Sequence, residues 1–445
     1  MKITKLIIPN YRQFRDFEID FTYPKGHIRA GEPLDKVCFI GKNGTGKSTL
    51  LKFLKNIVVK AQPMDTPVVI AKIEQKDTTF YSLWGGFMVK IVIDKKPTWL
   101  YQMDYLVKNF THRGYTPSEN ASLNAYIYTQ EERENLAVYL DTCIFSPAES
   151  YTNDLLKIKN VPETTLNDAL KSGKEAKLFH CVSNAHIANF WQQLIFSIKQ
   201  REEAFHVFAE ENSDKSYKNL RTEFEEKQPY ILKQLALFWD KMLGKVGLYF
   251  DYESAKKPIQ LTDNLLAYIK LSSTNQTIPY NELSTGIRNF IFRLGHIFSL
   301  FFAQETTGGF LLVDEPENSL FPDFRYDLIG IYQEIMAGKD TQFFVATHDP
   351  IIAAQFEPCE RIVLDFDEMG YVIAEKGTTP EGDDPNDILI QDFGIHSLLG
   401  KKGIEMWEKC VALKIEIRHT ENLEKKKELL SEYMKIAQSY HFPIS

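Results

Sequence analysis

The sequence predicts an α/β fold built on a parallel sheet, and three observations support this. The apolar segment 37–40 leads into a glycine-rich loop. Two further segments, 309–313 and 343–347, are almost continuously apolar, as expected for strands that are buried on both faces of a sheet. Apolar residues at helical spacing follow the glycine-rich loop, and again follow residue 286.

The glycine-rich loop, 41–48, fits the pattern G-x-x-x-x-G-K-[ST], which wraps the phosphates of a nucleotide. A strand before the loop and a helix after it are the context that this motif requires. Lys47 is expected to reach the β- and γ-phosphates, and the Ser48 hydroxyl to ligate Mg²⁺. The reading as a plain glycine turn is disfavoured because so specific a pattern rarely arises by chance. The expected nucleotide-binding residues here are Gly41, Asn43, Gly44, Thr45, Gly46, Lys47, Ser48 and Thr49.

The second apolar strand, 309–313, ends in two acids. Asp314 is expected to hold Mg²⁺, usually through water. Glu315 would then lie beside the γ-phosphate, where a carboxylate can orient and polarise the attacking water. A solvated acidic turn is the alternative, and the nearby phosphate loop disfavours it.

Two further segments are expected at the same ligand crevice. The strand 343–347 ends at His348, which is placed to donate a hydrogen bond to the γ-phosphate or to the attacking water. Residues 283–286 precede a predicted helix. Ser284 or Thr285 can serve there as an ordinary N-cap, and the same geometry also makes an anion site.

The order of these motifs resembles that of the ABC-class ATPases. The resemblance implies an ABC-type P-loop ATPase core in which 283–286 is the signature motif and His348 the switch histidine. Asp314 and Glu315 would be the Walker B pair, and 318–320 the loop that crosses a dimer interface. It further implies a head-to-tail homodimer or higher oligomer, in which Ser284 and Gly286 contact the γ-phosphate of an ATP bound by the other subunit.

A long insertion points to one branch of that family. Roughly 240 residues separate Gly41 from Leu283, more than in ABC transporter modules. Residues 10–21 and 314–322 resemble the opening strands and the D-E-P-E-x-x-L-H-P pattern of the SMC, RecF and OLD-like branch. This resemblance adds Arg12 as a nucleotide-binding residue. Phe321 stands where that pattern has histidine, and Ile287 where a glutamate is common.

Four regions are expected from these motifs. They are the N-terminal part of the ATPase core with the phosphate loop (1–110), a mainly helical insertion (111–265), the C-terminal part of the core (266–400) and C-terminal helices (401–445). Within the insertion, 141–149 is expected to form a short strand and loop, with Glu149 as a substitute for the Q-loop glutamine. Helices are predicted at 186–209 and 217–243, packed as a hairpin, and strands at 246–252 and 266–271, returning to the core.

The C-terminal region is predicted to contain a β-hairpin, 361–373, and two helices, 403–418 and 421–440. Asp365 and Asp367 are interpreted as turn residues rather than a metal-binding pair, because Gly370 marks a turn. The last helix is amphipathic. Packing on the core is favoured over a docking surface.

Composition limits the remaining classes. The net charge of −8 argues against a strongly basic nucleic-acid binder, although a local basic groove stays open. No signal peptide and no membrane-spanning run is recognised, so a cytoplasmic protein is expected. The five cysteines show no metal-ligand spacing, and reduced thiols are expected.

The function predicted is an ATP- and Mg²⁺-dependent, ATP-hydrolysing switch. A stand-alone ATPase with a compact insertion resembles the ATPase subunits of bacterial anti-phage systems of the Septu, PARIS and retron-associated types. That resemblance implies a separately encoded effector protein, often a nuclease. Two alternatives stay open, namely a RecF-like DNA repair ATPase that clamps DNA and a nucleotide-gated scaffold with negligible turnover. A transporter subunit is disfavoured by the insertion.

Overall fold

The computed structural model describes residues 2–60, 86–93, 96–103, 142–148, 179–183, 201, 204–227, 231–251, 269–278, 282–303 and 308–443. The chain divides into two compact units, Met1–Gly382 and Asp383–Ser445, each of which is considered by itself. The predicted Q-loop substitute, Glu149, lies outside the described residues, as does most of the helix predicted at 186–209.

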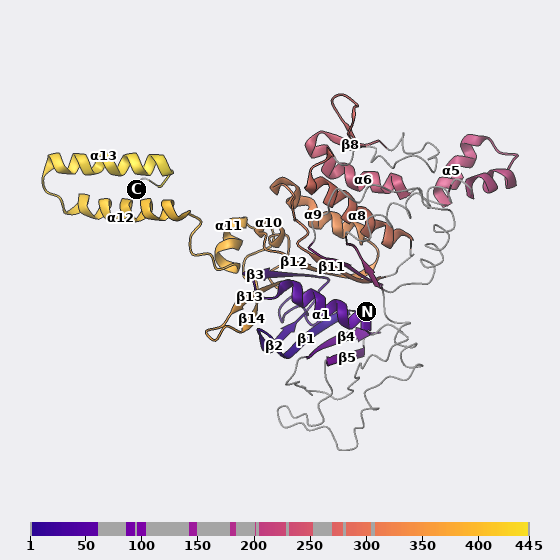
Figure 1. The fold of residues 1–445 in the computed structure, drawn as a ribbon, viewed down its shortest axis with the longest axis horizontal. Coiled ribbons are helices and arrows are strands. Elements are labelled where there is room, and N and C mark those ends of the chain that lie inside the picture. The colour runs from indigo at the N-terminus through magenta and orange to yellow at the C-terminus, as the bar shows by residue number, and fades with distance from the viewer. Residues whose placement is uncertain are drawn as a thin grey trace, which may run out of the picture. The chain divides into compact units, whose positions relative to one another are not determined.

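A seven-stranded sheet forms the centre of the first unit (Figure 1). Its order is β14-β13-β3-β12-β11-β6-β7, and every neighbouring pair is parallel except β13 and β14. The strands are β3 (Lys36–Gly41), β6 (Thr142–Ser146), β7 (Phe179–Cys181), β11 (Gly308–Asp314), β12 (Asp340–Ala346), β13 (Arg361–Phe366) and β14 (Val372–Lys376). The predicted α/β class with a mainly parallel sheet is therefore confirmed.

The central strands are apolar because both of their faces are covered. All seven residues of β11 are buried, and so are six of the seven in β12. Phe343 and Phe344 point to opposite faces, since side chains alternate along a strand. Phe344 packs in the cluster that contains Leu50 and Leu54, whereas the Phe343 ring lies 5.3 Å from that of Tyr332 on the other side.

The first face is covered by helix α1 (Lys47–Lys60), which follows the glycine-rich loop as predicted. This helix also contacts an antiparallel sheet of order β2-β1-β4-β5, so that it lies between the two sheets (Figure 1). The strands of this sheet are β1 (Lys2–Tyr11), β2 (Phe14–Asp20), β4 (Gly86–Ile93) and β5 (Lys96–Met103).

The second face is covered by α9 (Pro322–Ile335), whose Tyr332 contacts Phe343. Helix α8 (Thr285–Ala303), which was predicted to follow residue 286, packs against α9 and against α6 (Ile231–Leu243). Buried Trp239 of α6 donates a hydrogen bond to the backbone oxygen of Ile291, with a distance of 3.1 Å. Helix α10 (Pro350–Ala353) follows β12 and also contacts α9.

The predicted insertion contains more sheet structure than its composition indicated. Strands β6 and β7 lie within 111–265 and yet belong to the main sheet. The strands predicted near 246–252 and 266–271 are β8 (Leu248–Phe250) and β9 (Ile269–Leu271). They pair with each other and with β10 (Thr277–Ile278) in a separate three-stranded sheet, and β8 contacts α6. Their short antiparallel ladder satisfies its backbone groups locally.

The predicted helical hairpin is present in the part of it that the structure describes. Residues 204–211 are helical, and the rings of Phe205 and Phe208 pack on Phe224 of α5 (Tyr217–Lys227), with centroids 5.2 and 5.6 Å apart. Helices α5 and α6 occupy the range predicted as one helix, 217–243.

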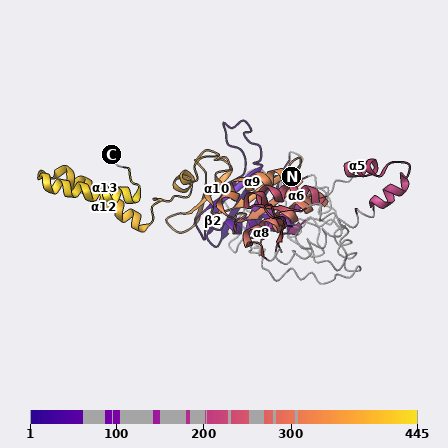
Figure 2. The ribbon, with the colours of Figure 1, turned by 90° about the horizontal axis from the view of Figure 1, so that it is seen from above.

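The second unit contains α11 (Pro385–Asp387) and the two predicted helices, α12 (Lys401–His419) and α13 (Leu423–Tyr440). Both views show α12 and α13 side by side (Figures 1 and 2). They share a small cluster of buried side chains, namely Cys410, Leu413, Tyr433, Ala437 and Phe442. Packing of the last helix on the ATPase core stays a prediction.

All five cysteines are unpaired; four are buried and Cys181 is half-buried. Among the described helices, none combines the length and the apolar character that a membrane crossing requires.

Candidate functional site

The glycine-rich loop lies between β3 and α1, where the predicted phosphate loop was expected. Lys47 is buried, and its ammonium donates hydrogen bonds to the backbone oxygens of Gly41 and Lys42, at 2.7 and 3.2 Å. Burial lowers the pKa of Lys47, and the nearby acids Glu315 and Asp314 oppose that shift. The Lys47 ammonium therefore lies at the centre of the loop, with the acids Glu315 and Asp314 close by.

Two neighbouring segments fix the shape of this loop. Gly41 has φ 135°, and a Cβ atom there would lie 2.1 Å from the backbone oxygen of Leu364. The Gln13 amide donates to the backbone oxygen of Gly44, at 3.1 Å. The loop residue Lys42 also pairs with Asp365, at 2.8 Å. Asp365 is thus engaged with the loop.

Arg12 lies in the turn between β1 and β2, directly before Gln13. It has φ 51°, is exposed, and its guanidinium lies 5.2 Å from the centre of the Tyr11 ring. The hydrogen bond from Gln13 to the loop places this turn beside the candidate phosphate site. A role for Arg12 in nucleotide binding stays a prediction.

Ser48 and Asp314 bring together two motifs that are far apart in the chain. The Ser48 hydroxyl donates to Oδ1 of Asp314, at 3.0 Å. Asp314 is buried at the end of β11, and burial raises its pKa, while the Ser48 hydroxyl acts in the opposite direction. Both groups offer oxygen ligands, which is the donor type that Mg²⁺ prefers.

Glu315 directly follows β11, and His348 lies two residues after the end of the neighbouring strand, β12. The Glu315 amide donates to the backbone oxygen of Ala346, at 2.8 Å, and thereby extends the β11–β12 ladder by one bond. Glu315 then turns out of the strand with φ 47°, and its Oε2 lies 2.5 Å from Nδ1 of His348. Burial raises the pKa of Glu315. His348 keeps 65% of its side chain exposed, so this pair faces solvent on the histidine side.

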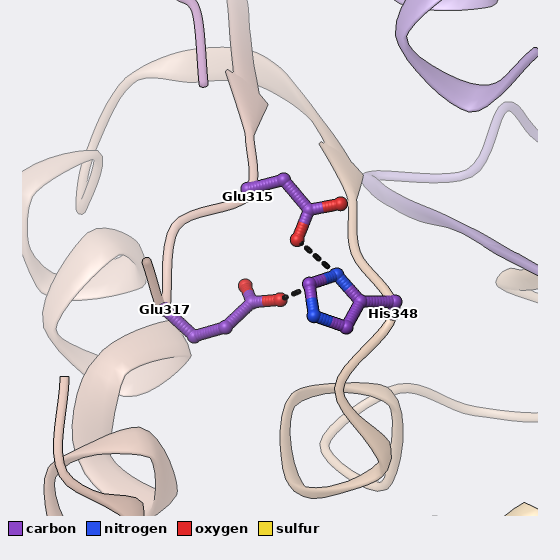
Figure 3. Close-up of side chains that lie close together, drawn as sticks. All are labelled: Glu315, Glu317 and His348. Atoms are coloured by element: carbon purple, nitrogen blue, oxygen red, sulfur yellow. Dashed lines mark ion pairs between the residues drawn. The ribbon is translucent and has the colours of Figure 1, made fainter. Parts of the chain in front are cut away.

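Glu317 is a third member of this group, and its role was not predicted from the sequence (Figure 3). Its Oε1 lies 3.9 Å from Nδ1 of His348 and accepts a hydrogen bond from the Thr347 hydroxyl. Only 3% of Glu317 is exposed. Burial, reinforced by the nearby Glu315, raises the pKa of Glu317 to about 8. The D-E-P-E pattern was the only signal in the sequence.

The trio of Glu315, Glu317 and His348 also offers potential metal ligands. One ligand atom from each residue lies within 4.8 Å of the others. The close pairing of His348 with Glu315 gives these atoms partners without an ion.

The predicted signature residues lie at the start of α8. The Ser284 hydroxyl accepts from the Ile287 amide at 3.4 Å, as a long N-cap contact, and Ser284 is exposed. Gly286 is buried, and a Cβ atom there would lie 2.1 Å from the backbone oxygen of Ser319. In the described residues, no hydrogen bond or ion pair joins Ser284 or Gly286 to the phosphate loop of the same chain.

Arg293 connects α8 with the end of β11. Its guanidinium donates to the backbone oxygens of Glu315 and Pro147, both at 2.9 Å. The first contact joins α8 to the backbone of Glu315, and the second joins it to the end of β6. A movement of α8 would therefore displace or break the contacts of Arg293 with the backbones of Glu315 and Pro147.

The structure thus gathers Lys47, Ser48, Asp314, Glu315 and His348 at the carboxyl ends of β3, β11 and β12. This is the edge at which open α/β sheets bind ligands. Comparison with known families agrees with this arrangement. A family model described as "AAA ATPase domain" matches residues 1–215 and 168–353.

Several solved structures are similar to the chain at low sequence identity. An SMC head bound to the C-winged helix domain of ScpA is 12% identical, with 84% of this chain and 98% of that chain covered and a TM-score of 0.42. The SMC head domain from Thermotoga maritima is 11% identical, with 85% and 100% covered and a TM-score of 0.40. A nucleotide-free ATP-binding cassette from an ABC transporter is 14% identical, with 85% and 92% covered and a TM-score of 0.29. No curated protein matches the chain.

Proposed function

The chain belongs to the AAA ATPase domain family, and from this premise we propose that it is a switch protein that binds and hydrolyses ATP. The observation that carries the proposal is the 3.0 Å contact between Ser48 and Asp314. This contact joins the end of the glycine-rich loop to the acidic residue that ends β11. A site for a nucleotide with a bound cation requires these two groups close together.

The residues of the loop have distinct roles in this proposal. The phosphates of ATP lie along Gly41, Asn43–Thr49 and the first turn of α1, where backbone amides and the helix dipole favour negative charge. Lys47 exchanges its loop carbonyls for phosphate oxygens of the substrate. Ser48 and Asp314 hold Mg²⁺, which when bound neutralises charge on the phosphates.

Hydrolysis is assigned to Glu315 and His348. The Glu315 carboxylate accepts a proton from water as the water oxygen bonds to the γ-phosphorus and the bond to ADP breaks. Burial favours this role because it increases the proton affinity of the carboxylate. Nδ1 of His348 lies 2.5 Å from Oε2 of Glu315, and most of the histidine side chain is exposed.

A second copy of the chain completes the site in this proposal. Ser284 is exposed at the start of α8, and in the described residues no hydrogen bond joins it to its own phosphate loop. This supports a head-to-tail dimer or higher oligomer, in which Ser284 and the Gly286 backbone face the γ-phosphate of the partner. Arg12, beside the loop of its own chain, contributes a further positive charge.

The biological role that we propose is that of the ATPase or sensor subunit of a bacterial anti-phage system, controlling a separately encoded effector such as a nuclease. Support comes from the sequence resemblance of the motifs to such ATPases. The test is to purify the complex from its own operon and to measure its mass with and without ATP. A co-purifying effector supports the role. A lone chain that dimerises with ATP and is stimulated by DNA favours a RecF-like clamp instead.

The enzymatic proposal predicts opposite behaviour for two variants. Lys47→Ala should weaken ATP binding at least tenfold, because a charged contact to phosphate is lost. Glu315→Gln should bind ATP with nearly unchanged affinity and hydrolyse it at least a hundredfold more slowly, because the base is lost. Binding is measured by calorimetry and turnover by phosphate release.

Lys218→Ala is the control for Lys47→Ala, because it removes an exposed lysine from a different helix, α5. Normal turnover by a folded Glu315→Gln protein would refute the assigned base. Tight ATP binding without any turnover in the unmodified protein would favour the scaffold alternative.

A further inference from the structure

The contact between Glu315 and His348 depends on two segments that follow different strands. Glu315 begins the segment 315–320, which leaves β11, and His348 lies in the turn between β12 and α10. The two side chains point toward one another, with Oε2 and Nδ1 2.5 Å apart (Figure 3). Groups that act together in a reaction lose much of their effect when they are displaced by about 1 Å. The relative position of the two backbones therefore matters for the proposed hydrolysis.

The segment 315–320 contains two residues in the left-handed region of backbone conformation. Glu315 has φ 47° and Ser319 has φ 65°. Between them, the Asn318 amide donates to the backbone oxygen of Glu315, at 3.2 Å. A positive φ is costly for residues other than glycine, so this conformation persists only where surrounding contacts hold it. The end of the segment is held by a side chain of α9.

That side chain is Arg325, which lies in the first half of α9. Its Nε and Nη2 both donate to the backbone oxygen of Leu320, at 3.0 and 2.8 Å. Because Leu320 directly follows Ser319, the guanidinium fixes the carbonyl next to the second residue with positive φ. The remaining nitrogen, Nη1, donates to Oδ2 of Asp349.

Asp349 is buried directly after His348 and is itself held by the backbone. Its Oδ1 accepts hydrogen bonds from the amides of Ile351 and Ile352, at 2.8 and 3.1 Å, and thereby caps α10. Its Oδ2 accepts from Arg325. A shift of the backbone at this turn would therefore strain either the cap or the ion pair.

We propose that Arg325 is a positioning residue for the contact between Glu315 and His348. It holds the backbones of both segments at once, through Leu320 and Asp349. This inference rests on the proposed hydrolysis of ATP. A guanidinium suits this task because it presents its donors in a rigid planar fork, here to a carbonyl and a carboxylate together. A lysine ammonium is a point charge on a flexible stem and does not fix two acceptors in this way.

Loss of the guanidinium should slow hydrolysis without weakening the binding of ATP. Arg325→Lys and Arg325→Ala should each lower kcat about tenfold to a hundredfold, because the displaced pair is poorly aligned. KM and the affinity for ATP, measured by calorimetry, should stay within about twofold, because the phosphate loop is unchanged. Loss of the fold would instead lower the affinity and the thermal unfolding temperature together with kcat. The split between kcat and KM thus separates positioning from a structural role.

Asp349→Asn tests the other end of the link. Asparagine is as good an N-cap as aspartate, so α10 keeps its cap, but the ion pair with Arg325 is lost. This variant should lower kcat by the same factor as Arg325→Ala. The double variant should be no slower than either single variant, because all three break the same link.

Asp327→Asn is the matched control on the same helix. It breaks the ion pair between Asp327 and Lys245, whose atoms are 2.6 Å apart, and that pair is not connected to Leu320 or Asp349 by any contact in the described residues. Because a partly exposed ion pair contributes little, kcat should stay within about twofold.

Hydrogen exchange followed by mass spectrometry gives a readout that needs no turnover. Arg325→Lys should speed the exchange of amides in 315–321 and in 349–354 at least about threefold, because both segments lose a contact that holds them. The amides of α1 should be unaffected. Asp327→Asn should leave all three regions unchanged.

Three results would overturn the inference: unchanged kcat in both Arg325→Lys and Asp349→Asn, additive losses in the double variant, or an equal loss in Asp327→Asn. Absence of turnover in the unmodified protein, or normal turnover by Glu315→Gln, would refute the proposed function instead. The exchange measurement would then still decide whether Arg325 holds the two segments together.

Discussion

Burial is the main cause of the raised pKa values of two acidic side chains in this protein. Glu317 and Glu360 are both buried acids, and in both, burial is the largest cause of a raised pKa. Glu360 accepts from the Glu357 amide at 2.9 Å and lies 3.4 Å from the Lys36 ammonium, and its pKa is about 7. The lysine reduces the effect of burial without cancelling it.

This makes the stability of the protein depend on pH through Glu360. Its pKa in the folded state lies above the value of 4.5 for an unperturbed glutamate. The folded state therefore binds more protons between about pH 4.5 and 7, and the free energy of unfolding falls as the pH rises through that range. Glu360→Gln keeps the acceptor for Glu357 and should flatten this dependence, as measured by denaturant unfolding at several pH values.

The exposed Glu375 provides the control, since Glu375→Gln should leave the pH dependence unchanged. An equally steep dependence in Glu360→Gln and in the unmodified protein would contradict the assignment.

At the scale of elements, a helix that lies directly against the backbone of another segment needs a glycine at the point of contact. Gly286 allows the first turn of α8 to lie directly against the backbone of Ser319, a residue with φ 65°. The predicted signature motif thus contains a glycine that this chain's own packing requires. Any contact with a nucleotide would come in addition to this packing.

Gly286→Ala should therefore destabilise the protein by about 1–3 kcal/mol, because the new methyl group would lie 2.1 Å from a backbone oxygen. Gly330→Ala is the matched control. Gly330 lies inside α9 with nothing within 4 Å of an added Cβ, so the change should be neutral or stabilise by roughly 0.5–1 kcal/mol. Denaturant unfolding measures both. Equal stability of the two variants would show that the contact with Ser319 relaxes freely.

The sequence predicted which segments of the core are strands and helices better than it predicted which strands pair. The strands 37–40, 309–313 and 343–347 are visible as apolar runs, and the glycine-rich loop identifies its own helix. The pairing of β6 with β11 was not visible, because parallel partners are joined by long connections that carry no local signal. The pairing of β8 with β9 was not visible either, because such short apolar patterns fit the edge of any sheet.

The candidate site shows the same division. Asp314 and Glu315 were predicted from their position after a buried strand, and the structure places them beside Ser48 and His348. Glu317 was not singled out, because its environment depends on Thr347, which directly follows another strand, β12. Sequence patterns can identify the end of a strand, but the side chains that face it come from tertiary structure.

At the scale of the whole molecule, the two units differ greatly in the size of their cores. The first has a seven-stranded sheet with helices on both faces, whereas the α12–α13 hairpin buries a small cluster. Local opening is easier where fewer apolar contacts must break. Amide hydrogens of β3, β11 and β12 should therefore exchange slowest, and those of α12 and α13 much faster.

Leu413→Ala should increase exchange in α12 and α13 and leave β3 unchanged, because Leu413 belongs to the hairpin cluster. Hydrogen exchange followed by mass spectrometry tests this directly. A uniform change in both units would indicate that they open as one cooperative body.

The position of β3 has a consequence for the synthesis of the chain. β3 ends at Gly41, but both of its neighbours, β12 and β13, begin only at Asp340 and Arg361. At 5–20 residues per second, the ribosome needs roughly 15–60 seconds to add the intervening ~300 residues. For that time this strand, in which five of the six residues are buried in the folded protein, has no partner on either edge. The apolar N-terminal segment is then a natural client for chaperones, and slower translation would prolong its risk of aggregation.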